Sequence, residues 1–154
     1  MALLREEIMV LRAAYKGTPP CVKKCQSSYK KDYTADKYYG KTAYDVPFSV
    51  QAIQREIMKN GPVVAIYTVY QDFAHYRRGI YKATYLQHTA GKATGAHAVK
   101  IIGWGKEENT PYWIIANSWH NDWGENGFFR MIRGINDCGI EGHVAAGLVG
   151  NGKR

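Results

Sequence analysis

Apolar positions recur along the chain with a helical spacing in one segment and in strand-like runs in others, and these patterns predict its main elements. Three apolar side chains fall on one face of a helix predicted over residues 49–59, which Ser49 can cap and which Asn60-Gly61-Pro62 ends. Residues 63–69 are a β-rich apolar run typical of a buried strand. Further strands are predicted at residues 79–83, 96–105, 112–119, 127–134 and 143–149. Their short connections favour an α+β fold, in which an antiparallel sheet curls toward a barrel beside one main helix.

Three other stretches lack the pattern of a strand. Residues 17–47 are rich in turn-forming residues and tyrosines and are predicted to be an extended surface loop, and residues 83–96 are predicted to be a loop as well. Residues 1–16 read as a short amphipathic helix. Charged residues interrupt this first segment, so it lacks the continuous apolar region of a signal peptide.

Composition narrows the possible classes of protein. The chain has 154 residues, 45% of them hydrophobic, which fits one globular domain. No apolar run approaches the roughly 20 residues of a membrane span, so we expect no membrane association. The formal charge of +8 comes from lysines and arginines that are scattered rather than gathered on one stripe. A solvated basic surface is therefore expected, and a nucleic-acid partner is not.

The three cysteines, Cys21, Cys25 and Cys138, leave at least one thiol free or paired outside the chain. Cys21 and Cys25 lie close together, as in a secreted disulfide framework, and are candidates for disulfide bonds. A local bridge between these two is the alternative. Their spacing does not match a CxxC redox motif, and no second ligand pair suggests zinc, so we expect neither a metal nor a cofactor.

A histidine and an asparagine on neighbouring predicted strands form the candidate catalytic group. His97 lies in an apolar strand and Asn117 in the next one along the chain. Alone, each would more often be a hydrogen-bonded core residue. Together they match a catalytic imidazole and the amide that orients it, with Trp119 two residues further on the same strand face as a shield. With asparagine in that role, the matching nucleophile is a cysteine thiolate.

At these residues the chain resembles the papain family of cysteine peptidases, and within it the cathepsin B group. The resemblance is carried by GAHAVKIIGWG, PYWIIANSWHNDWGENGFFRMIRG and CGIEGHVAAGLV, and for the cathepsin B branch by KNGPV and the region from CVKKC to KYYG. It covers residues 17–149 and implies the C-terminal part of a papain-like fold. Residues 1–16 match nothing in it, and residues 150–154 are a tail.

The resemblance implies roles for particular residues. His97 would be the general base and acid, Asn117 its orienter, and Trp119 the cover over both. Gly95 and Ala96 would line the substrate cleft. The pocket for the substrate's second residue before the cut would contain His143, where cathepsin B relatives have an acidic residue, and Ile66, where they usually have a small one. His120 replaces a smaller residue, for which we expect only a surface effect.

The family nucleophile stands in a Cys-Gly-Ser/Ala-Cys-Trp motif, on the order of 130–150 residues before the histidine. The chain holds no such motif, and none of its cysteines has that context. We therefore expect a segment of a peptidase that supplies base and orienter but is inactive by itself, needing the N-terminal half as its partner. The alternative is a non-catalytic truncated homologue that acts as a binding or decoy module.

The same resemblance implies peptide or protein substrates and suggests cystatin-like inhibitors as further partners. It also implies a lysosomal or extracellular location.

Overall fold

The computed structural model describes residues 20–83 and 90–150. The described residues fall into two compact units, one ending at Tyr38 and one beginning at Tyr39. The helix predicted within residues 1–16 lies outside the described residues, as do residues 84–89 of the loop predicted at 83–96 and most of the tail.

Residues 20–38 form turns that polar side chains hold together. Asp36 accepts a hydrogen bond from the Tyr29 hydroxyl at 2.9 Å and pairs with Lys31 at 3.4 Å. Asp32 accepts from the backbone N–H of Thr34 at 2.8 Å, which is the usual way an aspartate closes a short turn. This segment therefore has the surface-loop character that its sequence predicts.

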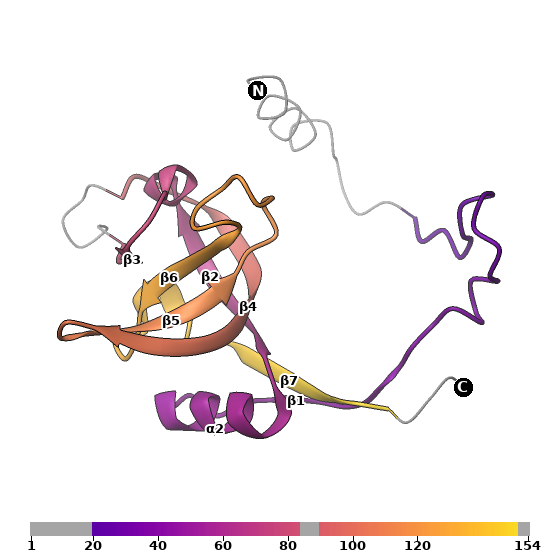
Figure 1. The fold of residues 1–154 in the computed structure, drawn as a ribbon, viewed down its shortest axis with the longest axis horizontal. Helices are drawn as coiled ribbons and strands as arrows, with labels where there is room; N and C mark the ends of the chain where they lie inside the picture. Colours follow the sequence, from indigo (N-terminus) through magenta and orange to yellow (C-terminus); the bar gives the residue numbers. More distant parts are fainter. Residues whose placement is uncertain (1–19, 84–89, 151–154) are drawn as a thin grey trace. The chain divides into compact units, whose positions relative to one another are not determined.

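The second unit is built on one seven-stranded sheet within the described residues, with the order β1-β7-β2-β4-β5-β6-β3 (Figure 1). The strands are β1 (Gly40–Asp45), β2 (Val63–Tyr70), β3 (Ile80–Tyr81), β4 (Ala93–Glu107), β5 (Thr110–Ala116), β6 (Phe128–Ile132) and β7 (Val144–Val149). In the same described part of the chain, the 3₁₀ helix η1 (Gln71–His75) follows β2 and the 3₁₀ helix η3 (Asp137–Gly139) lies between β6 and β7. The predicted helix-and-sheet fold is confirmed. The sheet is curled but not closed, so the barrel description is a loose one.

The pairing is antiparallel throughout except at one edge, where β3 runs parallel to β6. The sequence did not predict that exception, because β3 pairs through only Ile80 and Tyr81. The strand predicted at 112–119 is also shorter than expected, since β5 ends at Ala116.

The helix α2 (Val50–Asn60) confirms the helical prediction. Ser49 has extended backbone angles, and its hydroxyl accepts from the N–H of Ala52, as an N-cap does. Gly61 ends the helix with a φ of 96°, which favours glycine. Ile53 points into the core and is fully buried, which fixes the helix against the sheet.

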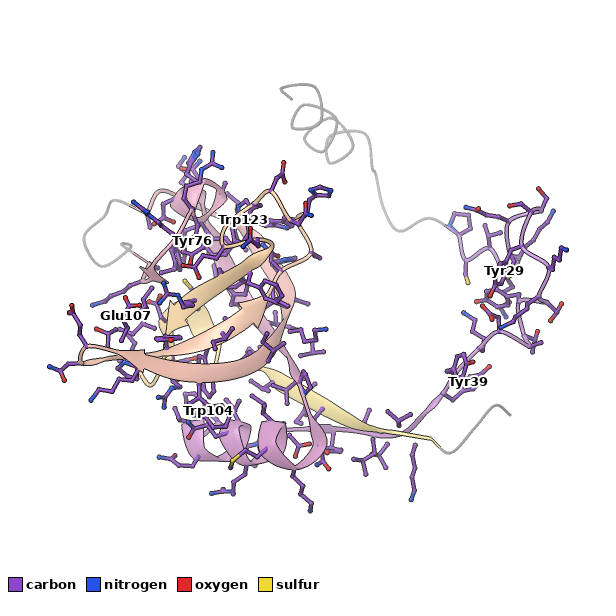
Figure 2. The ribbon with its side chains drawn as sticks, viewed as in Figure 1. Tyr29, Tyr39, Tyr76, Trp104, Glu107 and Trp123 are labelled. Carbon is purple, nitrogen blue, oxygen red and sulfur yellow. The ribbon has the colours of Figure 1, made fainter. Side chains whose placement is uncertain are left out.

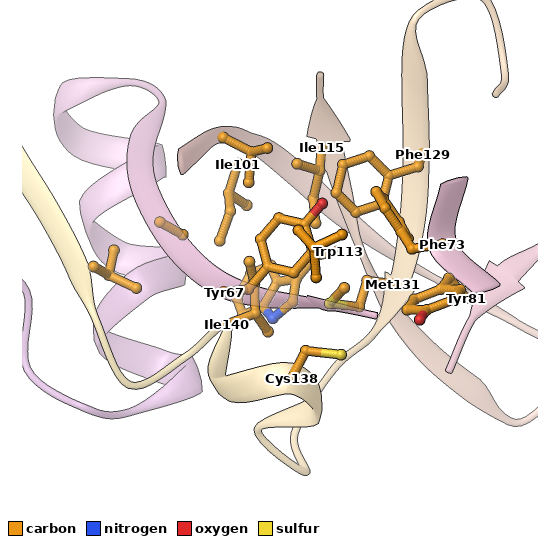
Figure 3. Packing of buried hydrophobic residues seen from close by; sticks show 14 of the residues in the cluster. Tyr67, Phe73, Tyr81, Ile101, Trp113, Ile115, Phe129, Met131, Cys138 and Ile140 are labelled. Carbon is orange, nitrogen blue, oxygen red and sulfur yellow. The ribbon is translucent and has the colours of Figure 1, made fainter. Parts of the chain in front are cut away.

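The core lies on the inner face of the curled sheet, where side chains of β2, β4, β5 and β6 meet (Figure 3). Along β2, Val63, Ala65 and Tyr67 are buried, whereas Val64 and Ile66 between them are 49% and 46% exposed. This alternation is the period-2 pattern of a strand with one buried face. The outer face of β2 is therefore apolar and open to solvent in this chain.

The strand β1 corrects the prediction of a loop over residues 17–47. It pairs with β7 from Gly40↔Val149 to Asp45↔Ala145. Most of its residues are exposed, so it shows no alternation of buried and exposed side chains. The hydrophobic pattern could not reveal it, because its order comes from backbone pairing rather than burial.

Candidate functional site

His97 stands on β4 directly opposite Tyr67 of β2, and its side chain is partly buried at the end of the core. Its Nε2 atom lies 2.9 Å from Oδ1 of Asn117. The structure thus brings together the two residues that the sequence nominated as base and orienter. The catalytic role of the pair stays a prediction.

Asn117 begins the loop that follows β5, rather than lying within the strand as predicted. Its backbone N–H donates to the carbonyl of Gly127 at 2.9 Å, which closes the base of the loop. Its Oδ1 atom also accepts from the backbone N–H of Ser118 at 2.8 Å. Because this backbone group can only donate, the atom facing both His97 and Ser118 must be the amide oxygen.

The orientation of the amide settles the tautomer of a neutral His97. The amide oxygen can only accept, so Nε2 of His97 must carry the hydrogen and donate it. The other ring nitrogen, Nδ1, is then unprotonated and keeps its lone pair. Among the described hydrogen bonds, none involves Nδ1. The arrangement therefore presents a nitrogen able to take a proton.

Trp119 stacks on His97, with ring centroids 5.2 Å apart and planes 27° from parallel. Its contact with His97 is observed, its role as a shield over the hydrogen bond stays a prediction, and the predicted reason for its position is wrong. Trp119 lies in a bend beyond the end of β5, so strand alternation does not place it. Its ring is instead held edge-on by Phe73 at 5.5 Å and Trp123 at 5.1 Å.

Three aromatic residues around the pair were missed by sequence reasoning. Phe73 on η1 is fully buried and contacts both tryptophans. Trp123 lies beside Tyr76 at 5.5 Å, at the end of the sheet away from α2 (Figure 2). Tyr67 meets the His97 ring edge-on at 6.0 Å, and burial raises the pKa of its hydroxyl, which stays neutral.

The proposed cleft residues are exposed positions of β4. Gly95 and Ala96, immediately before His97, are both exposed. Gly95 has a φ of 149°, and a side chain there would meet no neighbouring atom within 4 Å. The backbone before His97 is therefore accessible, as a peptide-binding edge requires.

The two proposed pocket residues also come together. The backbone N–H of Ile66 donates to the carbonyl of His143 at 3.0 Å. Both side chains are exposed, and Ile66 pairs with Ala98 on β4, next to His97 in the chain. The structure shows this neighbourhood, whereas their role in substrate selection stays a prediction.

The cysteines do not supply a nucleophile with suitable surroundings. Cys138, on η3, is 7% exposed, and burial together with Asp137 raises the pKa of its thiol (Figure 3). A reactive thiolate needs the opposite shift. Cys21 and Cys25 lie in the first unit, and all three cysteines are free. A disulfide bond of Cys21 or Cys25 is not observed and stays a prediction.

Within residues 20–83 and 90–150, no group of three or more His, Cys, Asp or Glu side chains is placed to hold a metal ion. No helix in these residues is long and apolar enough to cross a membrane.

Comparison with known proteins decides the family. The description "Papain family cysteine protease" matches residues 5–148, which is most of the chain. This chain belongs to the papain family. The match begins inside residues 1–16, the segment for which the sequence alone offered no resemblance.

Relatives within the papain family are cathepsin B-like. Cathepsin B-like cysteine proteinase 3 of Ostertagia ostertagi is 67% identical over 132 residues, covering 86% of this chain and 73% of that protein. Cathepsin B-like cysteine proteinase 1 of the same organism is 65% identical over 132 residues, but this chain covers only 37% of its length. Procathepsin B S9 from Trypanosoma congolense has the same fold, with a TM-score of 0.75 and 36% identity over 87% of this chain and 43% of that one. The chain thus spans less than half the length of the second and third of these proteins.

Proposed function

We propose that this chain supplies the base and the orienting amide of a cathepsin B-like cysteine peptidase, which hydrolyses peptide bonds by a Cys-His-Asn mechanism. The observation that carries the proposal is the contact of 2.9 Å between His97 Nε2 and Asn117 Oδ1 beneath the ring of Trp119. Family membership supports it, because papain-family proteins are cysteine proteases by description.

In the proposed reaction, Nδ1 of His97 takes the proton of a cysteine thiol, and the thiolate attacks the carbonyl carbon of the substrate. The resulting imidazolium then gives the proton from Nδ1 to the leaving amine as the C–N bond breaks. Water, deprotonated by the same nitrogen, hydrolyses the thioester. Throughout, Asn117 accepts from Nε2–H, which keeps the ring in one orientation for both proton transfers.

The attacking sulfur comes from outside this chain in our proposal. The buried position of Cys138 and its raised pKa support this, since a thiol that is hard to ionise is a poor nucleophile. The open apolar face of β2, with Val64 and Ile66 exposed, also supports it, because such a face is typical of an interaction surface. The partner is then the N-terminal half of the peptidase, and the isolated chain is inactive.

The pocket residues lead to a proposal on specificity. A neutral imidazole at His143 offers a substrate arginine no counter-charge, and a protonated one repels it. Ile66 also narrows the space beside it. We therefore expect the complete enzyme to prefer apolar residues over arginine as the second residue before the cut. Cystatin-like inhibitors and a lysosomal or extracellular location are expectations from the family resemblance.

A chimera tests the central proposal. The chain replaces the corresponding part of cathepsin B-like cysteine proteinase 1 of Ostertagia ostertagi, and the chimera is compared with the isolated chain on a fluorogenic peptide. We expect turnover only in the chimera, and a fall in kcat/KM of about 10²-fold or more for His97→Ala, as for loss of a general base. Activity of the isolated chain that disappears in Cys138→Ala would overturn the proposal.

A further inference from the structure

Glu125 stands near the end of the 117–127 loop, which carries Asn117 and Trp119. The backbone of Glu125 forms an isolated bridge with Phe128, donating at 2.9 Å and accepting at 3.1 Å. At the base of the loop, Asn117 donates to the carbonyl of Gly127, and Gly127 donates to that of Trp123 at 2.8 Å. These backbone bonds give the loop its shape, but they do not attach it to the rest of the unit.

The carboxylate of Glu125 attaches the loop to that unit, in addition to the aromatic contacts of the loop's tryptophans with Phe73. It accepts from Nη2 of Arg130 at 2.9 Å and from its Nε at 3.0 Å, a two-point contact with β6. It also accepts from the backbone N–H of Gly79 at 2.9 Å. One side chain thus joins the loop to a neighbouring strand and to a segment 46 residues earlier in the chain.

The Gly79 contact leads into a second set of hydrogen bonds. The Tyr76 hydroxyl donates to the carbonyl of Gly79 at 2.6 Å and accepts from the backbone N–H of Arg130 at 3.3 Å. The ring of Tyr76 packs against Trp123. Hence the contacts of Glu125 are linked to Trp123 through Tyr76.

From Trp123 a line of contacts reaches His97. Trp123 meets Trp119 at 5.1 Å with planes 75° apart, and Trp119 stacks on the imidazole at 5.2 Å. Displacing the loop would therefore move two things at once, the indole over His97 and the amide that accepts from it.

We propose that Glu125 is a positioning residue for the His97–Asn117 pair, acting through the 117–127 loop and not on the substrate. The inference rests on the proposed function of that pair. Glu125 differs from a partner in a surface ion pair, because the Glu125 and Arg130 side chains are only 28% and 20% exposed and the Glu125 carboxylate also accepts from the backbone N–H of Gly79.

Glu107 offers a matched control on the same arginine. Its carboxylate accepts from Nη1 of Arg130 at 2.6 Å, but it lies at the end of β4 beside the β4–β5 turn and is 57% exposed (Figure 2). Glu107→Gln removes the same charge from the same partner without touching the 117–127 loop. A general effect of charge on Arg130 would appear in both variants.

The test uses NMR of the 154-residue chain and needs no enzymatic activity. In the unmodified chain, the stacked indole should shift the ring-proton signals of His97, and the Asn117 contact should slow solvent exchange of its Nε2–H. In Glu125→Gln we expect these shifts to shrink and the exchange of Nε2–H to accelerate about tenfold, the scale of a lost charge-assisted contact. Glu107→Gln should leave both unchanged. Arg130→Lys, which keeps the charge but loses the two-point contact, should change both in the same direction as Glu125→Gln.

The inference is overturned if His97 responds equally to Glu125→Gln and Glu107→Gln. It is also overturned if exchange of the Gly79 amide accelerates in Glu125→Gln while the His97 signals stay unchanged, because the carboxylate would then hold Gly79 alone. Neither outcome depends on the chimera, so failure of the positioning role and failure of the proposed catalytic role remain distinguishable.

Discussion

The loops after β5 and β6 are each organised by one glutamate, but by different physical means. In the 117–127 loop, Glu125 is partly exposed and pairs with the guanidinium of Arg130. In the 134–142 loop, Glu141 is 4% exposed and accepts from neutral donors, namely Trp113 Nε1 at 2.9 Å, Gly134 N at 2.6 Å and Asn136 N at 3.0 Å. Among the described ion pairs, none involves Glu141.

The two loops carry residues with different proposed roles, one in the rate of the reaction and the other in the choice of substrate. The first loop carries Asn117 and Trp119, which would govern the rate of the reaction. The second leads directly into His143, which would govern substrate choice. The Glu125 carboxylate attaches its loop to β6 through a paired charge, whereas the Glu141 carboxylate uses neutral donors both to fix its loop's own shape and to attach the loop to β5 through Trp113.

The largest expected effect is on stability and concerns the second loop. Glu141→Ala leaves the buried Trp113 indole N–H without an acceptor, and it also removes the acceptor of the more exposed backbone N–H groups of Gly134 and Asn136. We expect the free energy of unfolding to fall by about 3 kcal/mol, since an unsatisfied buried group costs roughly 1–3 kcal/mol and the two partly exposed groups add to that loss. Urea denaturation measures this. The isosteric Glu141→Gln keeps one acceptor and should lose less, so equal losses in the two variants would contradict this account.

The next effect is on selectivity and also concerns the second loop. In the chimera, His143→Glu restores a carboxylate beside Ile66. Because a charge-assisted contact contributes about 1.5–3 kcal/mol, kcat/KM for an Arg-Arg peptide relative to a Val-Arg peptide should rise roughly 10- to 100-fold. Asn117→Ala, by contrast, should lower kcat/KM for both peptides alike. A chimera that already prefers Arg-Arg would end the pocket proposal.

The two loops should respond to acid with opposite signs. Burial raises the pKa of Asp137, on the second loop, above its ordinary value near 3.9, so the folded state binds that proton more readily. Its contribution should favour folding as pH falls through the folded pKa toward about 4. Arg130, followed by the Gly79 backbone N–H and Tyr76, lowers the pKa of Glu125 below its ordinary value near 4.3. That contribution is present above about pH 4.3 and is lost below it, as pH falls through the folded pKa.

Melting curves of Asp137→Asn and Glu125→Gln between about pH 3 and pH 7 measure these contributions. The unmodified chain should gain stability on mild acidification through Asp137, and Asp137→Asn should not show that gain. Glu125→Gln should be less sensitive to strong acid. If both substitutions changed the pH dependence of stability in the same direction, the opposite roles assigned to Asp137 and Glu125 would be contradicted.

The smallest effect concerns His120 in the first loop. Its φ of 76° lies in the left-handed region, and its side chain makes only an exposed contact of 3.2 Å with Asp122. His120→Gly removes the strain of a left-handed backbone at a non-glycine residue and loses only the exposed contact with Asp122. We therefore expect the free energy of unfolding to rise by about 0.5 kcal/mol. Thermal unfolding tests this, with Asp122→Ala as control for the lost contact. A clear loss of stability would contradict the expectation from the sequence that His120 has only a surface effect.

The sequence predicted the elements that burial organises. The helix around Ile53 and the strand through Tyr67 are confirmed because their apolar period matches their geometry. The strand β1 was not predicted, because its residues are largely exposed and its pairing with β7 is an interaction of backbones. Long-range register leaves no local trace in such a segment.

The same limit applies to the site. The meeting of His97 with Asn117 was predictable, since Asn117 directly follows β5, which pairs with the β4 strand that carries His97. The glutamates that organise the loops were not, although each follows a glycine-rich turn, as in WGENG and CGIEG. The local sequence does not indicate that Glu125 will contact Gly79, because the two residues are 46 positions apart and only the tertiary fold brings them together.

The position of Phe73 has a consequence for how such a protein can change over generations. This ring is fully buried and touches Tyr81 at 4.8 Å on one side and Trp119 at 5.5 Å on another. A substitution of Phe73 would change the packing of the core and the position of the Trp119 ring over His97 together. A substitution that is tolerated in a core remote from the site would therefore not be neutral here. Exchanges at Phe73 should therefore be accepted only alongside compensating changes in its aromatic neighbours.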